Sequence, residues 1–143
     1  MSAVSTSDPR AVASPSPDAA PFWKGLSEHR LVLPRCGACD QSFFYPRILC
    51  PRCGSRDVYW IGASGRGTVY SFCVVHQSSV PGLADAVPFV TGLVDLEEGP
   101  RVLGYLRGFP DDPEQIRCGT PVEVAYIDVP DGQTLLAFTP RDS

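Results

Sequence analysis

The sequence predicts a mainly β protein in which an N-terminal helix and a rubredoxin-like zinc ribbon precede a five-stranded OB-fold barrel. Two Cys-x-x-Cys pairs in the first half of the chain have ten residues between them, as in closed zinc sites. The second half contains five runs of alternating apolar residues separated by turn residues, as in small barrels. The composition, 43% hydrophobic and 20% charged over 143 residues, is that of a folded protein.

Residues 1–20 contain five Ser, five Ala and three Pro but no aromatic residue, too little apolar material to offset the entropy of ordering a backbone. We therefore predict a disordered leader over 1–20. A transit peptide is the alternative, but Arg10 is its only basic residue and Asp8 and Asp18 are acidic. Because the sequence has no secretory signal and no apolar run of the ~18 residues that a membrane span needs, we expect a cytoplasmic protein without a membrane partner.

The predicted helix and ribbon occupy residues 21–62. Apolar residues at 22, 23 and 26 have the spacing of one helical face. Gly25 weakens this helix, so we expect it to depend on the docking of Phe22 and Trp23. The run 31–33 is expected to form a short strand that leads into the first cysteine pair.

Four cysteines of the ribbon are the predicted metal ligands: Cys36, Cys39, Cys50 and Cys53. Each pair presents two thiolates from one tight turn, here called a knuckle, and two facing knuckles provide a tetrahedral set. Asp40 and Gly54 follow the knuckles and suit a positive φ, which turns backbone N–H groups toward the sulfurs. A closed four-sulfur site has no open position, so we predict structural Zn²⁺. Iron in the same site, as in a rubredoxin-like electron carrier, is the alternative.

Residues 63–143 form the predicted barrel, which is entered through a linker at 62–67. Its five predicted strands are 67–76, 89–96, 101–107, 122–129 and 133–138. Two hairpin turns are expected, at Glu98-Gly99 and Asp131-Gly132. A short helix is predicted over 112–119, capped by Asp112. Five strands with a helix between the third and fourth is the order of an OB fold.

The other cysteines and histidines match no catalytic signature, so we predict no catalytic residue. Cys73 and His76 could form a Cys–His pair, but on a regular strand their side chains point to opposite faces. We expect Cys73 to be a small buried hydrophobe on the same face as Val69. His29 and His76 have no Ser, Asp or Glu at a motif spacing, and Cys118 is left over.

The two predicted modules carry opposite charge. Residues 22–62 contain six basic and three acidic side chains, for a net charge of +3, whereas residues 63–143 contain five and eleven, for −6. The acidic barrel disfavours nucleic acid as a partner, because single-strand binding needs a basic groove with exposed aromatic side chains. A single-stranded nucleic-acid-binding module is nevertheless the alternative function, since zinc ribbons and OB folds both serve in that role.

The order of these parts resembles the zinc-ribbon plus OB-fold acyl-CoA-associated family, long called domain of unknown function thirty-five. The resemblance runs from about Pro21 to Pro140, and Cys118 departs from the aliphatic or small residue expected at its position. The motifs that carry it are Phe22-Trp23, Phe44-Tyr45-Pro46-Arg47, Cys50-Pro51-Arg52-Cys53-Gly54, Gly65-Arg66-Gly67-Thr68-Val69-Tyr70-Ser71-Phe72, Pro88-Phe89-Val90 and Cys118-Gly119-Thr120-Pro121-Val122.

The resemblance implies a non-catalytic accessory subunit that binds and stabilises a thiolase-fold acyl-CoA enzyme: a thiolase, an acyltransferase or a steroid side-chain retro-aldolase. It also implies a heteromer built around a partner dimer, with the nucleophile and bases on the larger subunit and a CoA thioester bound at the interface. Some members of the family occur fused or bound to hydratases.

Partner and ligand contacts are not assigned to residues. The aromatic run 43–46 either fills the junction of ribbon and barrel, which we expect, or anchors a partner. Arg47, Arg52 and Arg66 could meet a CoA phosphate, but exposed arginines usually only solvate a surface.

Overall fold

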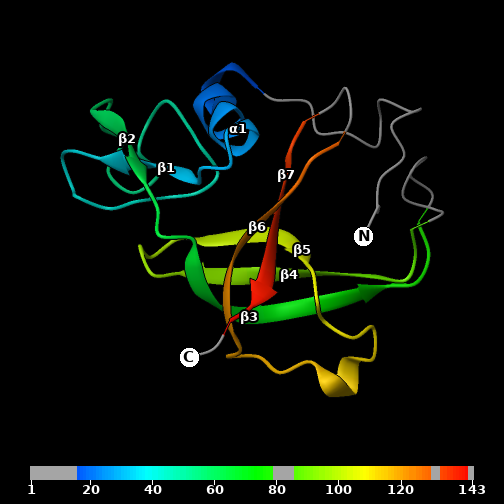
Figure 1. Cartoon of the computed structure of the whole chain (residues 1–143). Coiled ribbons are helices and arrows are strands. Elements are labelled where there is room, and N and C mark those ends of the chain that lie inside the picture. Colours follow the sequence, from blue (N-terminus) through cyan, green and yellow to red (C-terminus); the bar gives the residue numbers. More distant parts are fainter. Residues whose placement is uncertain (1–15, 79–85, 130–132, 142–143) are drawn as a thin grey trace.

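The computed structural model describes residues 16–78, 86–129 and 133–141. A two-stranded ribbon and one α-helix lie beside a closed five-stranded barrel (Figure 1). The helical elements are the 3₁₀ turns η2 (Pro17–Ala19) and η3 (Pro113–Gln115) and the helix α1 (Ala20–Ser27). The strands are β1 (Val32–Cys36), β2 (Val58–Gly62), β3 (Arg66–Val75), β4 (Phe89–Leu96), β5 (Arg101–Leu106), β6 (Pro121–Ile127) and β7 (Leu135–Pro140).

The barrel has the predicted OB-fold topology. Its strands close in the order β3-β4-β5-β7-β6, with β6 returning to pair with β3 and only the β5–β7 pair parallel. The connection between the third and fourth barrel strands contains η3, a single turn that is shorter than the predicted helix 112–119. Asp112 caps it as expected, because its carboxylate accepts a hydrogen bond of 3.0 Å from the Glu114 N–H. The predicted hairpin turn Asp131-Gly132 lies outside the described residues.

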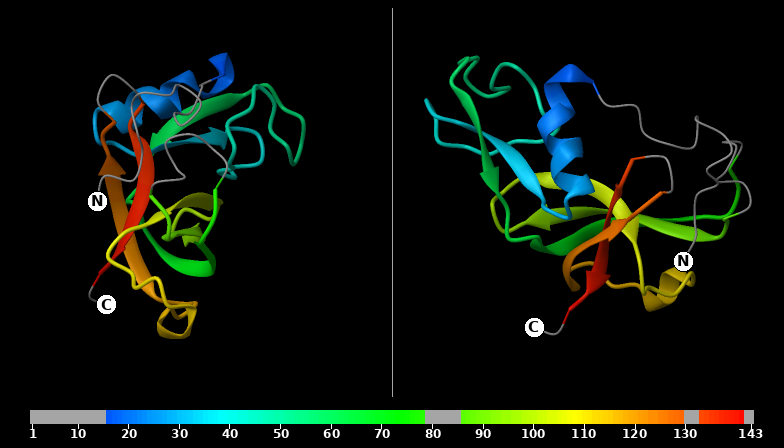
Figure 2. Two further views of the ribbon diagram at one scale, coloured as in Figure 1. Left: turned by 90° about the vertical axis from the view of Figure 1, so that its right-hand side faces the viewer. Right: turned by 45° about the horizontal axis from the view of Figure 1, so that its top comes forward.

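The ribbon consists of β1 and β2, which pair antiparallel from Val32 opposite Gly62 to Cys36 opposite Val58. The observed strand β1 therefore begins one residue later than the predicted strand 31–33 and is longer. Its partner β2 was not predicted, because the 21 residues between the strands give no local sign of the pairing. Figure 2 shows α1 between this ribbon and the β6–β7 end of the barrel.

One hydrophobic core spans both modules, so that the ribbon is packed onto the barrel. Phe22 and Leu26 of α1 and Leu33 of β1 belong to the same buried cluster as Val94 of β4 and Phe138 of β7. The predicted docking of Phe22 and Trp23 is thus observed. Gly25 is buried where α1 meets the chain that follows it. A Cβ at this position would lie 2.7 Å from the Arg30 carbonyl oxygen, so the close contact needs a glycine.

Two expectations are wrong: that Cys73 is buried, and that residues 16–20 belong to a disordered leader. Cys73 is exposed, because a bulge at Tyr70 shifts the register of β3 and inverts its faces beyond that point. Val69 therefore faces the core before the bulge, and Phe72 and Val74 pack against the core after it. The described chain also begins before residue 21: η2 covers Pro17–Ala19, and Ala19 is fully buried. Residues 1–15 of the predicted leader lie outside the described residues.

In the part of the chain that the structure describes, no helix is both long enough and apolar enough to cross a membrane.

Candidate functional site

The four predicted ligand cysteines come together at the end of the ribbon farthest from the barrel linker. The sulfur atoms of Cys36, Cys39, Cys50 and Cys53 all lie within 4.8 Å of one another. The Sγ–Sγ distances are 3.6 Å for Cys36 and Cys53 and 3.7 Å for Cys39 and Cys50. Four sulfurs about 2.3 Å from one ion form a tetrahedron with edges of about 3.8 Å. The arrangement therefore fits one tetrahedrally bound ion and leaves no open coordination position.

Both knuckles have the same backbone geometry. The N–H groups of Ala38 and Cys39 donate to Cys36 Sγ, and the N–H of Arg52 donates to Cys50 Sγ, over 3.3–3.4 Å. Asp40 and Gly54 then take positive φ values of 61° and 75°, as the sequence predicted. Their N–H groups donate back to the carbonyl oxygens of Cys36 and Cys50 at 2.9 Å. These bonds close each turn and orient the sulfurs.

The N–H···S bonds make the first cysteine of each knuckle the more acidic one. The Cys39 N–H lowers the pKa of the Cys36 thiol below its ordinary value. Burial raises the pKa of Cys50, but the N–H groups of Cys53 and Arg52 and the neighbouring thiols outweigh it and bring this pKa to about 7.

The second cysteines have the opposite shift. Burial raises the pKa of Cys39 to about 12. The Ser55 N–H lowers the pKa of Cys53, but the bond to Cys36 and burial raise it by more.

The aromatic run between the knuckles is divided between the ribbon's own cluster and the core shared with the barrel. Phe43 is buried against the knuckle cysteines, and Phe44 packs edge-on against Phe22 at 5.2 Å between ring centroids. The hydroxyl of the more exposed Tyr45 accepts a 3.1 Å hydrogen bond from the Trp23 indole. Phe44 packs against the cluster that spans ribbon and barrel, as expected, whereas Phe43 belongs to the ribbon's own cluster.

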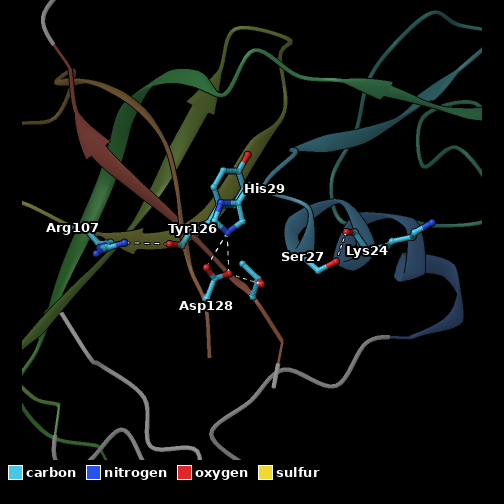
Figure 3. Close-up of polar contacts among 7 residues, drawn as sticks. Lys24, Ser27, His29, Arg107, Tyr126 and Asp128 are labelled. Atoms are coloured by element: carbon cyan, nitrogen blue, oxygen red, sulfur yellow. Dashed lines mark hydrogen bonds and ion pairs between the residues drawn. The ribbon is translucent and has the colours of Figure 1, made fainter. Parts of the chain in front are cut away.

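A second polar cluster at the junction was not predicted (Figure 3). His29 follows α1 with φ 57°, in the position after a helix where glycine is usual. Its ring stacks on Tyr126 of β6, with 4.7 Å between centroids, and its Nε2 lies 3.0 Å from both oxygens of Asp128. Thr134 donates to Asp128 at 3.0 Å. Nothing in the local sequence joins His29 to residues about one hundred positions away.

The three arginines considered for CoA phosphate are not gathered in one site. Arg66, at the start of β3, forms an ion pair of 3.0 Å with Glu97. Arg47 and Arg52 are exposed on the ribbon, close to the second knuckle. We therefore assign no CoA-binding residue.

Two family profiles match the chain and meet within β2 of the ribbon. Residues 23–58 match "ChsH2, rubredoxin-like zinc ribbon domain", and residues 60–127 match "ChsH2, C-terminal OB-fold domain". Among solved structures, the chain is similar to one titled "Ltp2-ChsH2(DUF35) aldolase", with a TM-score of 0.79 and 34% identity. The match covers 90% of this chain and 98% of that one.

Curated relatives are named as enzyme subunits or scaffolds. The 3-oxo-4,17-pregnadiene-20-carboxyl-CoA hydratase alpha subunit of Mycobacterium tuberculosis is 43% identical over 94% of this chain and 42% of its own length. A DUF35 domain-containing scaffold protein of Methanocaldococcus jannaschii is 31% identical over 73% of each chain. The benzoylsuccinyl-CoA thiolase subunit BbsA of Geobacter metallireducens is 32% identical over 77% of this chain and 65% of its own. The chain thus spans about two fifths of the length of the hydratase subunit.

Proposed function

Because the chain belongs to the DUF35 family of zinc-ribbon and OB-fold proteins, we propose that it is a non-catalytic accessory subunit of a thiolase-fold enzyme that acts on an acyl-CoA. The observation that carries this proposal is the pairing of one closed cysteine site with a barrel in a single core. The names of the relatives support it, since they include a thiolase subunit, an aldolase and a scaffold protein.

In this proposal Cys36, Cys39, Cys50 and Cys53 bind one Zn²⁺. The ion is a cross-link that supplies folding free energy to a ribbon with a small core of its own. The apolar cluster of the ribbon contains Phe43 and the buried cysteines, with Val58 packed beside them. The zinc site thus keeps the ribbon folded as a rigid platform on the barrel.

The large subunit would contain the nucleophile and bases, and its dimer would form the centre of the heteromer. The accessory subunit would help to form the acyl-CoA site at the interface. The acidic barrel and the basic ribbon give the two modules different electrostatic preferences for that partner.

Native co-purification tests the proposal. The tagged full chain is expressed in the organism that encodes it and is isolated without denaturants, and its companions are identified by mass spectrometry. We expect a thiolase-fold subunit in stoichiometric amount and no thioester turnover by the isolated chain. A lone monomer, a complex that contains only a hydratase, or turnover without a companion would each contradict the proposal.

A further inference from the structure

Exposed apolar side chains are concentrated on the ribbon. Among the described residues, six large hydrophobic side chains are exposed: Tyr45, Ile48, Leu49, Tyr59, Tyr70 and Leu103. The first four belong to the ribbon, although it is the smaller module. Ile48 and Leu49 are consecutive, with exposures of 61% and 42%. Single exposed hydrophobes are ordinary, but a contiguous apolar surface marks an interaction site.

The loop that contains these two residues is held firmly at both ends. Before it, Phe43 is buried and donates its N–H to the Pro34 carbonyl at 3.1 Å, and Pro46 is buried as well. After it, the buried Cys50 donates its N–H to the Ser55 carbonyl at 2.9 Å. The backbone on both sides of Ile48 and Leu49 is therefore anchored. A preorganised surface loses less entropy when it binds.

Positive charge flanks the apolar pair. Arg47 and Arg52 are both exposed. The ion pairs of the described residues are His29–Asp128, Arg35–Asp40, Arg66–Glu97 and Arg101–Asp95, so neither arginine has a carboxylate partner there. Arg47, Ile48, Leu49 and Pro51 also border a hollow of about 480 Å³, in which Asp18 is the acidic lining residue.

We propose that the ribbon tip, defined as Arg47, Ile48, Leu49, Pro51 and Arg52, is the surface by which this chain docks on its thiolase-fold partner. The partner surface is an apolar pocket rimmed by Asp or Glu side chains, which complement the two arginines. This inference rests on the proposed function and deepens it.

The side chains of the tip favour a protein over a nucleic acid. Bases stack on aromatic rings, whereas the residues that follow Arg47 are the aliphatic Ile48 and Leu49. Arginine is enriched at protein interfaces, and aliphatic anchors fill apolar pockets. A second apolar hollow, lined by Trp23, Tyr45 and Leu103 among others, has no charged residue in its lining, and nothing in it indicates an occupant.

The test measures affinity between the full chain and the thiolase-fold subunit recovered by co-purification. Ile48→Asp places a carboxylate in the apolar pocket, and Arg47→Glu reverses the complementary charge. Leu103→Asp on β5 is the matched control, because Leu103 is 62% exposed and Ile48 61%. We expect Ile48→Asp and Arg47→Glu to weaken binding by about tenfold or more and Leu103→Asp to change it by about twofold or less.

Metal content and circular dichroism are measured for each variant. If Ile48→Asp loses its metal, Arg47→Glu decides the question, because this side chain is exposed and forms no ion pair with any residue that the structure describes. Binding of both tip variants with the affinity of the wild type, or an equal loss with Leu103→Asp, overturns the docking surface and leaves the proposed function standing. Absence of any thiolase-fold companion removes both. Binding of a single-stranded oligonucleotide that the tip variants abolish overturns the assignment in favour of nucleic acid.

Discussion

The Nε2 atom of His29 lies 3.0 Å from both carboxylate oxygens of Asp128, a contact between residues 99 positions apart in sequence. His29 lies two residues after the helix α1, and Asp128 follows the barrel strand β6. The contact therefore joins the ribbon module to the barrel at the end of β6 that lies away from η3. Because His29 takes φ 57°, an unfavourable conformation for a residue with a Cβ, the tertiary contacts have to offset a local strain.

Substitution of His29 separates the strain from the contacts. His29→Ala keeps the strained Cβ and loses both the stacking on Tyr126 and the bond to Asp128. We expect it to lower the free energy of unfolding by about 1–2 kcal/mol. His29→Gly relieves the strain and should recover about 1 kcal/mol of this loss. Urea titration followed by tryptophan fluorescence measures both, and equal stabilities of the two variants would show that the conformation is not strained.

The stability that Asp128 contributes depends on pH. The hydrogen bond from His29 lowers the pKa of Asp128 below its ordinary value of 3.8, and the bond from Thr134 adds to this. The stabilisation is therefore present above about pH 4 and is lost as the pH falls through the lowered folded-state value. Asp128→Asn should be less stable than wild type by less than about 1 kcal/mol near neutral pH, since the pair is exposed. The difference between wild type and variant should vanish as the pH falls well below about 4, and a difference that persists there would contradict this account.

Removal of the metal should unfold the ribbon. The purified chain is expected to contain one zinc ion and to lose it to a strong chelator, which competes with the four thiolates for the ion. The thiolates regain protons once the ion has left. The near-ultraviolet signal of Trp60 on β2 should be lost with the ion. Metal analysis and circular dichroism follow the two events, and Cys73→Ser is the control that keeps its metal. Retention of the signal after complete removal would contradict a structural role, and a red iron protein would favour the electron carrier.

Gly25→Ala should destabilise the protein although it raises helix propensity. In an exposed helix this change stabilises by about 1 kcal/mol. Here the new Cβ would lie 2.7 Å from the Arg30 carbonyl oxygen and 3.1 Å from a Val32 methyl group, so α1 would have to move away from the ribbon. We expect a net loss of about 1–3 kcal/mol in thermal or urea unfolding. The exposed Lys24→Ala in the same helix is the control and should stay within about 0.5 kcal/mol of wild type.

Two of the six cysteines should react with a thiol reagent in the native metal-bound protein. Cys73 and Cys118 are exposed and lie outside the cysteine cluster. The other four are ligands in the proposed site and become reactive only in denaturant with chelator. Cys73→Ser should reduce the fast-reacting count to one. If only Cys118 reacts in the wild type, the bulge at Tyr70 does not expose Cys73.

The parts predicted correctly have local signals. Ligand spacing placed Cys36, Cys39, Cys50 and Cys53 together, and residue types alone predicted the positive φ of Asp40 and Gly54. Period-2 alternation found the five barrel strands, and their order with a turn before β6 indicated the topology. Family membership agrees with these local patterns.

The parts that were missed depend on contacts between distant segments. The pairing of β2 with β1, the bulge that turns Cys73 outward, and the bond between His29 and Asp128 have no counterpart in the neighbouring sequence. A single extra residue in β3 inverts every side chain after it, and the place of that residue is chosen by the packing of Phe72 and Val74 into the barrel. Short-range spacing was thus sufficient to predict that the four cysteines cluster and in which order the strands follow, whereas the packing of ribbon against barrel determines which side chains are left exposed.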